Sequence, residues 1–204
     1  FMELFFARKE EHILYKAFFL AKNHIQYPMS VLFSYSSIFK EFNAWFVQLW
    51  GESLGKIDKQ GNNVGLSPIG LIGSIDQHSF LQLIVQGRAD KSVSFLSLSP
   101  HAIPKDSPEI PNLSLPHLQS TDFINKVKFC ELLEKQKCAT LETLQAQNIP
   151  VDSIELESLD EASVGGLIAY FELLTSATGC ALEINTYDQP GVEFGKKRLR
   201  KMFK

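Results

Sequence analysis

Cysteine is scarce in this sequence of 204 residues, which contains three: Cys130, Cys138 and Cys180. They form no C-x-x-C pair and show no Cys/His spacing typical of a zinc site. Cys130 and Cys138 fall in one predicted helix, where an eight-residue separation places them roughly 12 Å apart, too far for a disulfide. An odd number of cysteines without a disulfide framework favours reduced thiols and a cytoplasmic protein.

Long apolar runs are also missing, since no stretch approaches the roughly twenty residues that a membrane helix needs. The apolar start, 1–6, has no preceding basic segment and no small-residue cleavage site, so it does not predict a signal peptide. The net charge is −3, which excludes the global basic field typical of nucleic-acid-binding proteins. No internal repeat is visible, which excludes a helical-repeat protein. We therefore expect neither a membrane nor a nucleic acid as partner.

The composition that remains is globular, with 45% apolar and 21% charged residues. Short apolar strands alternate with longer helices, and this alternation predicts an α/β layered domain around a parallel sheet. The expected strands cover 31–33, 92–99 and 151–156, and the expected helices cover 9–23, 37–55, 79–86, 121–148 and 164–174. Five prolines between positions 100 and 116 predict a long surface loop over 99–119.

The glycine-rich stretch 65–74 is expected to be a loop, followed by a helix with Ser74 or Asp76 as its N-cap. His78 would then lie in the first helical turn, where the helix dipole disfavours a charged imidazolium. A neutral His78 able to exchange a proton is the functional interpretation, and a surface or hydrogen-bonded structural histidine is the alternative.

The apolar helix over 164–174 also carries end signals. Ser158, with Glu161 three residues later, predicts a capping box at its start, and Gly179 is expected to end it in the C′ position. Gly165 and Gly166 weaken this helix by roughly 1 kcal/mol each relative to alanine, which predicts close packing against a neighbouring backbone.

The helix expected over 37–55 carries two polar residues suited to chemistry. Its apolar side chains recur at spacings of three and four and indicate one buried face: Phe42, Trp45, Phe46 and Leu49. Gln48 and Glu52 lie four residues apart and so share a face beside that stripe. A carboxylate beside aromatic side chains is suited to act as a general base. The alternative is a solvent-facing Gln and Glu on an amphipathic helix.

Near the C-terminus, Pro190 with Asp188 as a candidate N-cap predicts a terminal helix. Gln189 and Lys196 lie seven residues apart, on the same side and two turns from each other. The last nine residues, 196–204, hold six basic residues, which complement the dipole at a helix C-terminus or raise the local concentration of an anionic metabolite.

Three segments in this order resemble the glucose-6-phosphate isomerase family. Residues 187–196 read Y-D-Q-P-G-V-E-F-G-K and match the family's C-terminal signature, [FY]-[DN]-Q-x-G-V-E-x-x-K. Residues 48–56 read Q-L-W-G-E-S-L-G-K and match its Q-x-x-x-E-S-x-G-K helix. Residues 77–87 read Q-H-S-F-L-Q-L-I-V-Q-G and match its Q-H-x-F-x-Q-L-I-x-Q-G helix.

The resemblance implies a role for each matching residue. Glu52 would be the general base that moves a proton between C1 and C2 of the sugar through a cis-enediol. His78 and Lys196 would open the sugar ring, and Gln48 and Gln189 would help to hold the sugar phosphate. The resemblance calls for no metal and no cofactor.

The resemblance also implies a fold and a partner. Members of the family contain two three-layer α/β/α sugar-isomerase (SIS) subdomains, each with a parallel sheet. Residues 1–178 would form the second of these, and residues 179–204 would form the signature segment and a C-terminal helical arm, without the N-terminal subdomain. The family is dimeric, so we expect a homodimer in which His78 reaches the partner's active site.

Two family segments have no match in this chain: the G-G-R-[FY]-[ST] segment and the S-K-T-x-x-T phosphate turn, which would both precede residue 1. The sequence is thus expected to be the C-terminal part of a compact, bacterial-type isomerase, with little or no activity alone. A non-catalytic SIS-type module for sugar-phosphate binding or dimerisation is the alternative. Such a module has no need for Glu52, His78 and Lys196 together, so their joint presence favours the enzyme.

Overall fold

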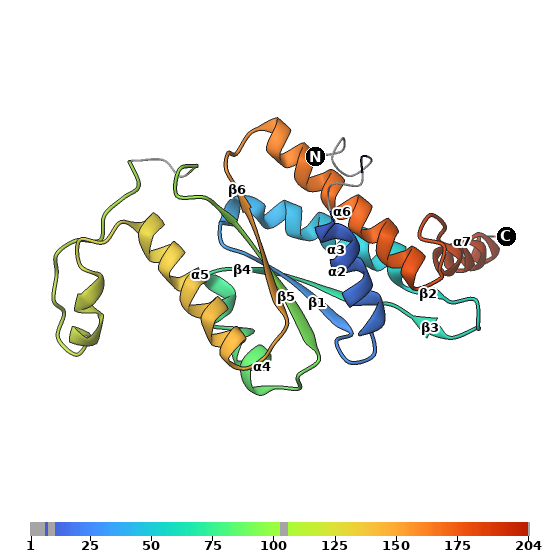
Figure 1. Cartoon of the computed structure of the whole chain (residues 1–204), viewed down its shortest axis with the longest axis horizontal. Helices are drawn as coiled ribbons and strands as arrows, with labels where there is room; N and C mark the ends of the chain where they lie inside the picture. Colours follow the sequence, from blue (N-terminus) through green and yellow to red (C-terminus); the bar gives the residue numbers. More distant parts are fainter. Residues whose placement is uncertain (1–6, 8–10, 103–105, 204) are drawn as a thin grey trace.

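A computed structural model describes Ala7, residues 11–102 and residues 106–203 (Figure 1). The apolar segment 1–6 and the first positions of the helix expected over 9–23 lie outside the described residues. The elements in chain order are α2 His12–Lys22, β1 Met29–Ser34, η1 Ser37–Phe39, α3 Lys40–Leu54, β2 Lys56–Ile57, β3 Asn63–Val64, β4 Ser67–Ile72, η2 Ile75–Gln77, α4 Leu81–Gln86, β5 Lys91–Leu98, η3 Gln119–Ile124, α5 Phe129–Ala146, β6 Val151–Leu156, α6 Glu161–Ala181 and α7 Pro190–Met202.

Four parallel strands form the central sheet in the order β4-β1-β5-β6. β1 pairs with β4 on one side and with β5 on the other, so that Phe33 lies between Leu71 and Phe95. Five of its six residues are buried, as expected for an inner strand of a parallel sheet that is covered on both faces. The predicted α/β class with a parallel sheet is confirmed.

The first face of the sheet is covered by α2, α3 and α6 (Figure 1). Leu32 and Leu96 point from the sheet into this layer, where they join a cluster that contains Trp50 and Phe171. The ring of Phe171 meets the ring of Phe46 edge-on, with 5.4 Å between the centroids. The aromatic stripe predicted on α3 therefore packs against α6.

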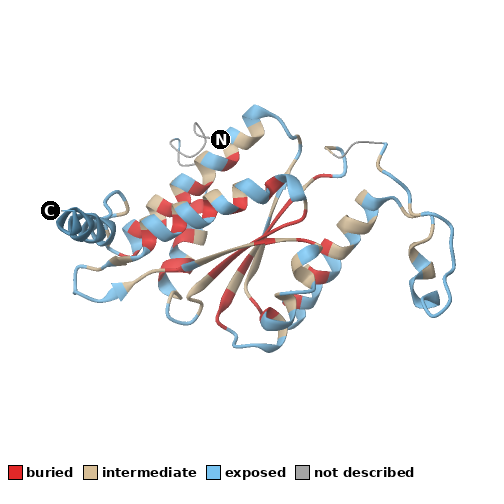
Figure 2. Ribbon diagram, turned by 180° about the vertical axis from the view of Figure 1, so that it is seen from behind, coloured by how far each residue is buried: buried red, intermediate tan, exposed pale blue. Residues whose placement is uncertain are grey.

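The second face is covered by α4 and α5, and this makes the domain three-layered (Figure 2). Because side chains alternate along a strand, Phe33 and Phe95 point to this face while their neighbours point to the other. They pack with Ile84 of α4 and Leu144 of α5.

The expected loop over 65–74 is wrong, because Ser67–Ile72 forms β4, the edge strand beside β1. Pro68 is tolerated because it lies on an edge. Gly70 is required where α3 crosses the strand, since a Cβ there would lie 2.9 Å from the Cβ of Asn43. Asn43 is buried and joins three elements: it accepts a hydrogen bond from the Ser34 hydroxyl (2.6 Å) and donates to the Leu71 carbonyl (2.8 Å).

The predicted ends of the helix that follows β6 are also wrong. α6 begins after Asp160, whose carboxylate accepts the backbone N–H of Ser163, and the Ser158 hydroxyl donates to the same carboxylate. These hydrogen bonds, that of Ser163 foremost, hold the pKa of Asp160 below its usual value. The capping residue is therefore Asp160, not Ser158.

At its other end α6 continues through Gly179 and ends at Ala181. The residue with the left-handed backbone conformation expected at Gly179 is instead Glu183, with φ 57°. Gly179 is needed because a Cβ there would collide with Cγ2 of Thr186, in the segment that leaves the helix. Gly165 and Gly166, in contrast, have no described atom within 4 Å of a Cβ, so the predicted close packing at these two glycines is wrong.

α6 is long and apolar enough, by length and composition alone, to cross a membrane. The expectation that no stretch approaches membrane length is therefore wrong for α6, whose apolar residues are interrupted by Glu172. One side of α6 packs against α2 and α3, as in the core helix of a globular domain.

The loop and helix between β5 and β6 follow the sequence expectation in part. The described part of 99–118 holds no helix or strand, apart from one bridge between Glu109 and Lys128, and η3 begins at Gln119. α5 covers only 129–146 of the predicted helix 121–148, because residues 119–124 form η3 and Lys128 forms the bridge, whereas β6 matches the predicted 151–156.

Removing a ring from the first core cluster tests the importance of this layer. Phe171 is 1% exposed, so Phe171→Ala is expected to lower the free energy of unfolding by about 3–5 kcal/mol through lost burial and a cavity. Phe123→Ala is the matched control, since that ring is 81% exposed and its loss is expected to change stability by less than about 0.5 kcal/mol. Urea unfolding followed by tryptophan fluorescence measures both, and equal effects would contradict the packing described.

Candidate active site

An open groove of about 780 Å³ lies where the end of α3, the β2–β3 hairpin and the start of α7 meet. It is lined by residues from all three: Gly51, Glu52, Gly55, Lys56, Ile57, Asn63, Val64, Gln189, Pro190, Gly191 and Val192. Two of the three motif segments, far apart in the sequence, thus share one groove.

Glu52 is the central polar residue of this groove. Its Oε2 accepts a hydrogen bond from Nε2 of Gln189 (2.8 Å), and its Oε1 accepts a longer one from Nε2 of Gln48 (3.3 Å). The structure therefore brings Gln48, Glu52 and Gln189 together. The aromatic side chains of α3 point to the opposite side, into the core, and Glu52 is exposed. The expectation that aromatic walls flank Glu52 is wrong for this chain.

The segment between α6 and α7 is tied to the hairpin beside the groove. Nζ of Lys56 donates to the backbone carbonyl of Asp188 and lies 3.5 Å from its Oδ1. Glu183, at the other end of this segment, accepts hydrogen bonds from Gln60 (3.1 Å) and Lys59 (3.4 Å). The Gln60 bond and the Lys59 charge hold the pKa of Glu183 below its usual value. Sequence reasoning assigned no role to Lys56, although the matched Q-x-x-x-E-S-x-G-K motif contains it.

Lys196 does not join Glu52 in the described structure. It lies on α7, the helix at the C-terminal end in Figure 1, and pairs with Glu193 one turn earlier (2.7 Å). Every residue of α7 is exposed, including the apolar Val192 and Phe194. The expected N-cap Asp188 is also wrong, because Gln189 occupies that position while its side chain bonds Glu52.

His78 lies at the other end of the sheet from Glu52. α3 runs antiparallel to β4: Gly51 is next to Pro68 at the start of the strand, and Asn43 is next to Gly70 further along. His78 follows the end of β4, so the length of this six-residue strand, roughly 17 Å, separates the two ends. It is exposed and follows η2, three residues before α4 begins, so the expected position in the first turn of a helix is wrong.

Gln77, the residue before His78, anchors this segment to the core. Its Nε2 donates to the Tyr35 hydroxyl (3.0 Å) and to Oγ1 of Thr140 (2.5 Å) and so links η2, the end of β1 and α5. Gly73 allows the segment between β4 and η2 to lie against the Tyr35 ring, since a Cβ on Gly73 would lie 2.6 Å from that ring. In the Q-H motif, therefore, the glutamine is structural and the histidine is presented outward.

Tyr35 is the buried phenol of this network. Burial raises its pKa to about 12, against the opposing effect of hydrogen bonds with Thr140 and Gln77. It also lines a cavity of about 150 Å³ at the carboxyl edge of the sheet, together with Ser97, Cys130 and Glu134. Ligands of open α/β sheets commonly bind at this edge. None of the predicted site residues lines this cavity, although His78 follows the carboxyl end of β4 at the same edge.

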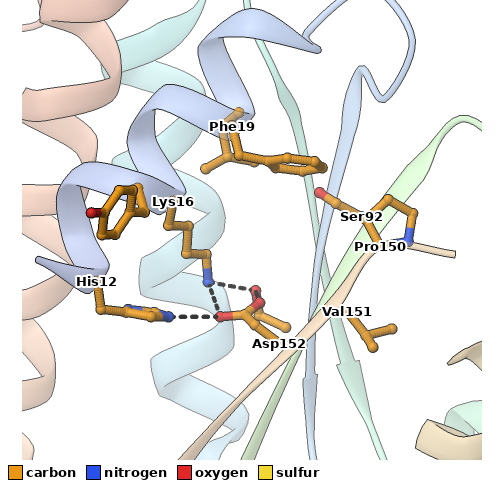
Figure 3. Close-up of a pocket in the computed structure, with 10 residues that line it drawn as sticks. His12, Lys16, Phe19, Ser92, Pro150, Val151 and Asp152 are labelled. Carbon is orange, nitrogen blue, oxygen red and sulfur yellow. Dashed lines mark hydrogen bonds and ion pairs between the residues drawn. The ribbon is translucent and has the colours of Figure 1, made fainter.

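A third cavity, of about 300 Å³, lies between α2 and the β5–β6 edge (Figure 3). Lys16 of α2 donates to Asp152 (2.6 Å) and to the Ser94 hydroxyl (2.8 Å), and that hydroxyl donates to Asp152 (2.7 Å). His12 lies 3.9 Å from the same carboxylate. These groups satisfy one another and fasten α2 to the sheet.

The described residues contain neither a candidate metal site nor a disulfide. No group of three or more His, Cys, Asp or Glu side chains in them is arranged to hold a metal ion. The three cysteines are free, and Cys138 and Cys180 are exposed. Partial loss of water around the thiol, foremost, and then its hydrogen bond with Glu134 and the charge of that carboxylate raise the pKa of Cys138.

The parallel sheet, its two helical layers and the arm that meets α3 define a three-layer α/β/α protein of the sugar-isomerase type. The model of the phosphoglucose isomerase family matches residues 12–204. The chain therefore belongs to the phosphoglucose isomerase family.

Relatives in bacteria agree with this assignment. A glucose-6-phosphate isomerase of Campylobacter jejuni is 49% identical over 199 residues, which are 97% of this chain and 47% of the relative. One of Thermus thermophilus is 34% identical over 192 residues, or 94% of this chain and 45% of the relative. The chain spans about half the length of the curated relatives it matches.

Solved structures share the fold. The crystal structure of a hypothetical protein from Thermus thermophilus matches with a TM-score of 0.82 and 32% identity, over 94% of this chain and 45% of that one. A glucose-6-phosphate isomerase from Chlamydia trachomatis matches with a TM-score of 0.70 over 94% of this chain and 38% of that one. At 23% identity, that second match supports the fold alone.

The raised pKa of Tyr35 predicts a stability change in alkali. The unfolded chain loses the phenolic proton near pH 10, whereas the folded chain keeps it to about pH 12. The contribution of Tyr35 is therefore complete below pH 10 and is lost as the pH rises from 10 to 12. In Tyr35→Phe, the free energy of unfolding should decline less steeply over this interval than in the parent.

Urea unfolding at a series of pH values measures this decline. Tyr187→Phe is the control, because Tyr187 is exposed and should leave the parent's profile unchanged. An identical decline in all three proteins would contradict the assignment of the buried phenol.

Proposed function

We propose that this chain is the C-terminal part of a glucose-6-phosphate isomerase, which interconverts glucose 6-phosphate and fructose 6-phosphate. The proposal follows from the family and from the printed activity of its relatives. Residues 1–178 would form one SIS subdomain, and residues 179–204 the signature segment and its helical arm. The observation that carries it is the hydrogen bond from Gln189 to Glu52, which joins two family motifs 137 residues apart in one groove.

In the proposed reaction the Glu52 carboxylate removes the proton from C2 of the open-chain aldose. The electron pair of that C–H bond forms the C1=C2 bond of a cis-enediol while the C1 carbonyl oxygen takes up a proton. The C2 hydroxyl then loses its proton, and Glu52 returns the abstracted proton to C1. C1 is reduced to an alcohol and C2 is oxidised to a ketone, so the reaction needs no external oxidant.

The environment of Glu52 suits this role. The hydrogen bonds from Gln48 and Gln189 fix the plane of the carboxylate, and each of its oxygens keeps a second lone pair for the sugar. Exposure of Glu52 leaves the groove open to a substrate. Gln48 and Gln189 would hold the sugar phosphate, and Lys196 would assist ring opening.

The position of His78 supports a dimer. Ring opening needs His78 and Lys196 near the same sugar, yet the length of β4 separates His78 from the Glu52 of its own chain. A second copy that presents its exposed His78 to this groove would satisfy both conditions. We also propose a cytoplasmic location, which the three free cysteines favour.

A coupled assay for conversion of fructose 6-phosphate to glucose 6-phosphate tests the activity. It is run on this 204-residue chain and on the protein extended to its natural N-terminus. We expect turnover only in the extended protein, because the chain matches about half of each relative's length. Absence of turnover in both would favour the non-catalytic sugar-phosphate-binding or dimerisation module instead.

Substitution of the base tests the mechanism in the extended protein. Glu52→Gln should lower kcat by about 10²–10⁴-fold, the usual contribution of a positioned acid–base group, and should leave fructose 6-phosphate binding largely intact. Glu41→Gln is the control, since Glu41 is exposed at the opposite end of α3. Turnover of Glu52→Gln within about tenfold of the parent would remove Glu52 from the role of base.

A further inference from the structure

Lys56 is a cation whose side chain, though not its backbone, is buried at the edge of the candidate groove. Its side chain is 6% exposed, although it follows α3 directly and begins a short hairpin. A lysine so far from water needs partners for its ammonium group. Those partners are the backbone carbonyl and the carboxylate of Asp188, which lies 132 residues further along the chain.

The local backbone directs Lys56 to this place. Gly55 ends α3, and Gly65 at the base of the hairpin packs on it so closely that a Cβ on Gly65 would lie 3.2 Å from the Gly55 Cα. The hairpin therefore starts next to the last turn of α3, with Lys56 four residues after Glu52. Two side chains from one helix end thus hold two consecutive residues of the C-terminal segment: Lys56 holds Asp188, and Glu52 holds Gln189.

The other contacts between the hairpin and this segment are weaker anchors. Lys59 and Gln60 both reach Glu183, but they are exposed, and Lys59 keeps 71% of its side chain in water. Exposed pairs of this kind contribute little, because water and salt screen them. Among these contacts the buried ammonium of Lys56 is the one that fixes the backbone next to Gln189.

We propose that Lys56 is a positioning residue of the isomerase site: by holding the Asp188 carbonyl it aims the Gln189 side chain at Glu52. This inference rests on the proposed function for its catalytic consequence, but not for its structural one. Without the ammonium, the segment that precedes α7 loses its buried anchor, and Gln189 no longer orients the base. The sugar would still bind, but the Glu52 carboxylate would less often be oriented correctly to remove its proton.

Hydrogen exchange of the 204-residue chain tests the structural step. Lys56→Met keeps a long apolar stem and removes the donor, and it should speed amide exchange at least tenfold in peptides from 185–196 while peptides from β1 and β5 stay protected. Lys59→Met is the matched control and should exchange like the parent. Unchanged exchange in Lys56→Met would overturn the proposal. If amide exchange in β1 and β5 also becomes faster in Lys56→Met, the same comparison is made with Lys56→Arg, which retains hydrogen-bond donors at a different spacing. Unchanged exchange over 185–196 in both variants would then overturn the proposal.

Kinetics of the extended protein test the catalytic step. Lys56→Met should lower kcat by about 10- to 100-fold, as expected for a displaced catalytic group, with KM within about threefold of the parent. In a Gln189→Ala background the same substitution should change kcat by less than about threefold, because Lys56 acts through Gln189. Lys59→Met should retain the parent's kcat.

The outcomes separate this inference from the proposed function. Two results would overturn the positioning role and leave the isomerase assignment standing. One is normal turnover of Lys56→Met in the extended protein. The other is a loss of kcat on Lys56→Met that is as large in the Gln189→Ala background as in the parent. An inactive extended protein would refute the isomerase, and the exchange comparison would still decide whether Lys56 holds the arm.

Discussion

The pairing of β1 with strands on both of its sides is the constraint from which the rest of the structure follows. Because β4 and β5 are both parallel to β1, each connection must cross a face of the sheet, and helices cover both faces. Phe33 and Phe95 are therefore buried under α4 and α5, while Leu32 and Leu96 are buried under α2, α3 and α6. α3 must run back along the sheet from the end of β1 to the start of β4.

This return path of α3 determines where the candidate site residues Glu52 and His78 lie. Glu52 lies near the end of α3, beside the start of β4, while the segment with His78 leaves from the end of the same strand. The two residues are kept apart by the strand between them. The C-terminal segment comes to Glu52 instead, since α6 packs beside α3 and the chain that leaves it passes the β2–β3 hairpin. The groove is thus made by a helix, a hairpin and an arm.

Several glycines and polar residues in the motifs are explained by packing. Gly70, Gly73 and Gly179 each lie where another chain segment passes too closely for a Cβ. Gln77 ties its loop to Tyr35 and Thr140, which leaves His78 free to face outward. The Q-H motif thus combines a proposed catalytic histidine with a glutamine that holds its segment in position.

The sequence alone determined the α/β class, the boundaries of β6 and the presence, though not the ends, of the helices that cover the sheet, because apolar periodicity reports which side of an element is buried. It also brought out Gln48, Glu52 and Gln189 through their motifs. Only the tertiary structure decided that Ser67–Ile72 is a strand, since the glycine-rich stretch 65–74 is typical of a loop, and the packing of Asn43 on Gly70 is not visible in the sequence. The same holds for the N-cap at Asp160, the passage of α6 through Gly179 and the ammonium of Lys56 on Asp188. These features depend on contacts between residues distant in sequence, and neither local propensity nor spacing records which distant segment will be the neighbour.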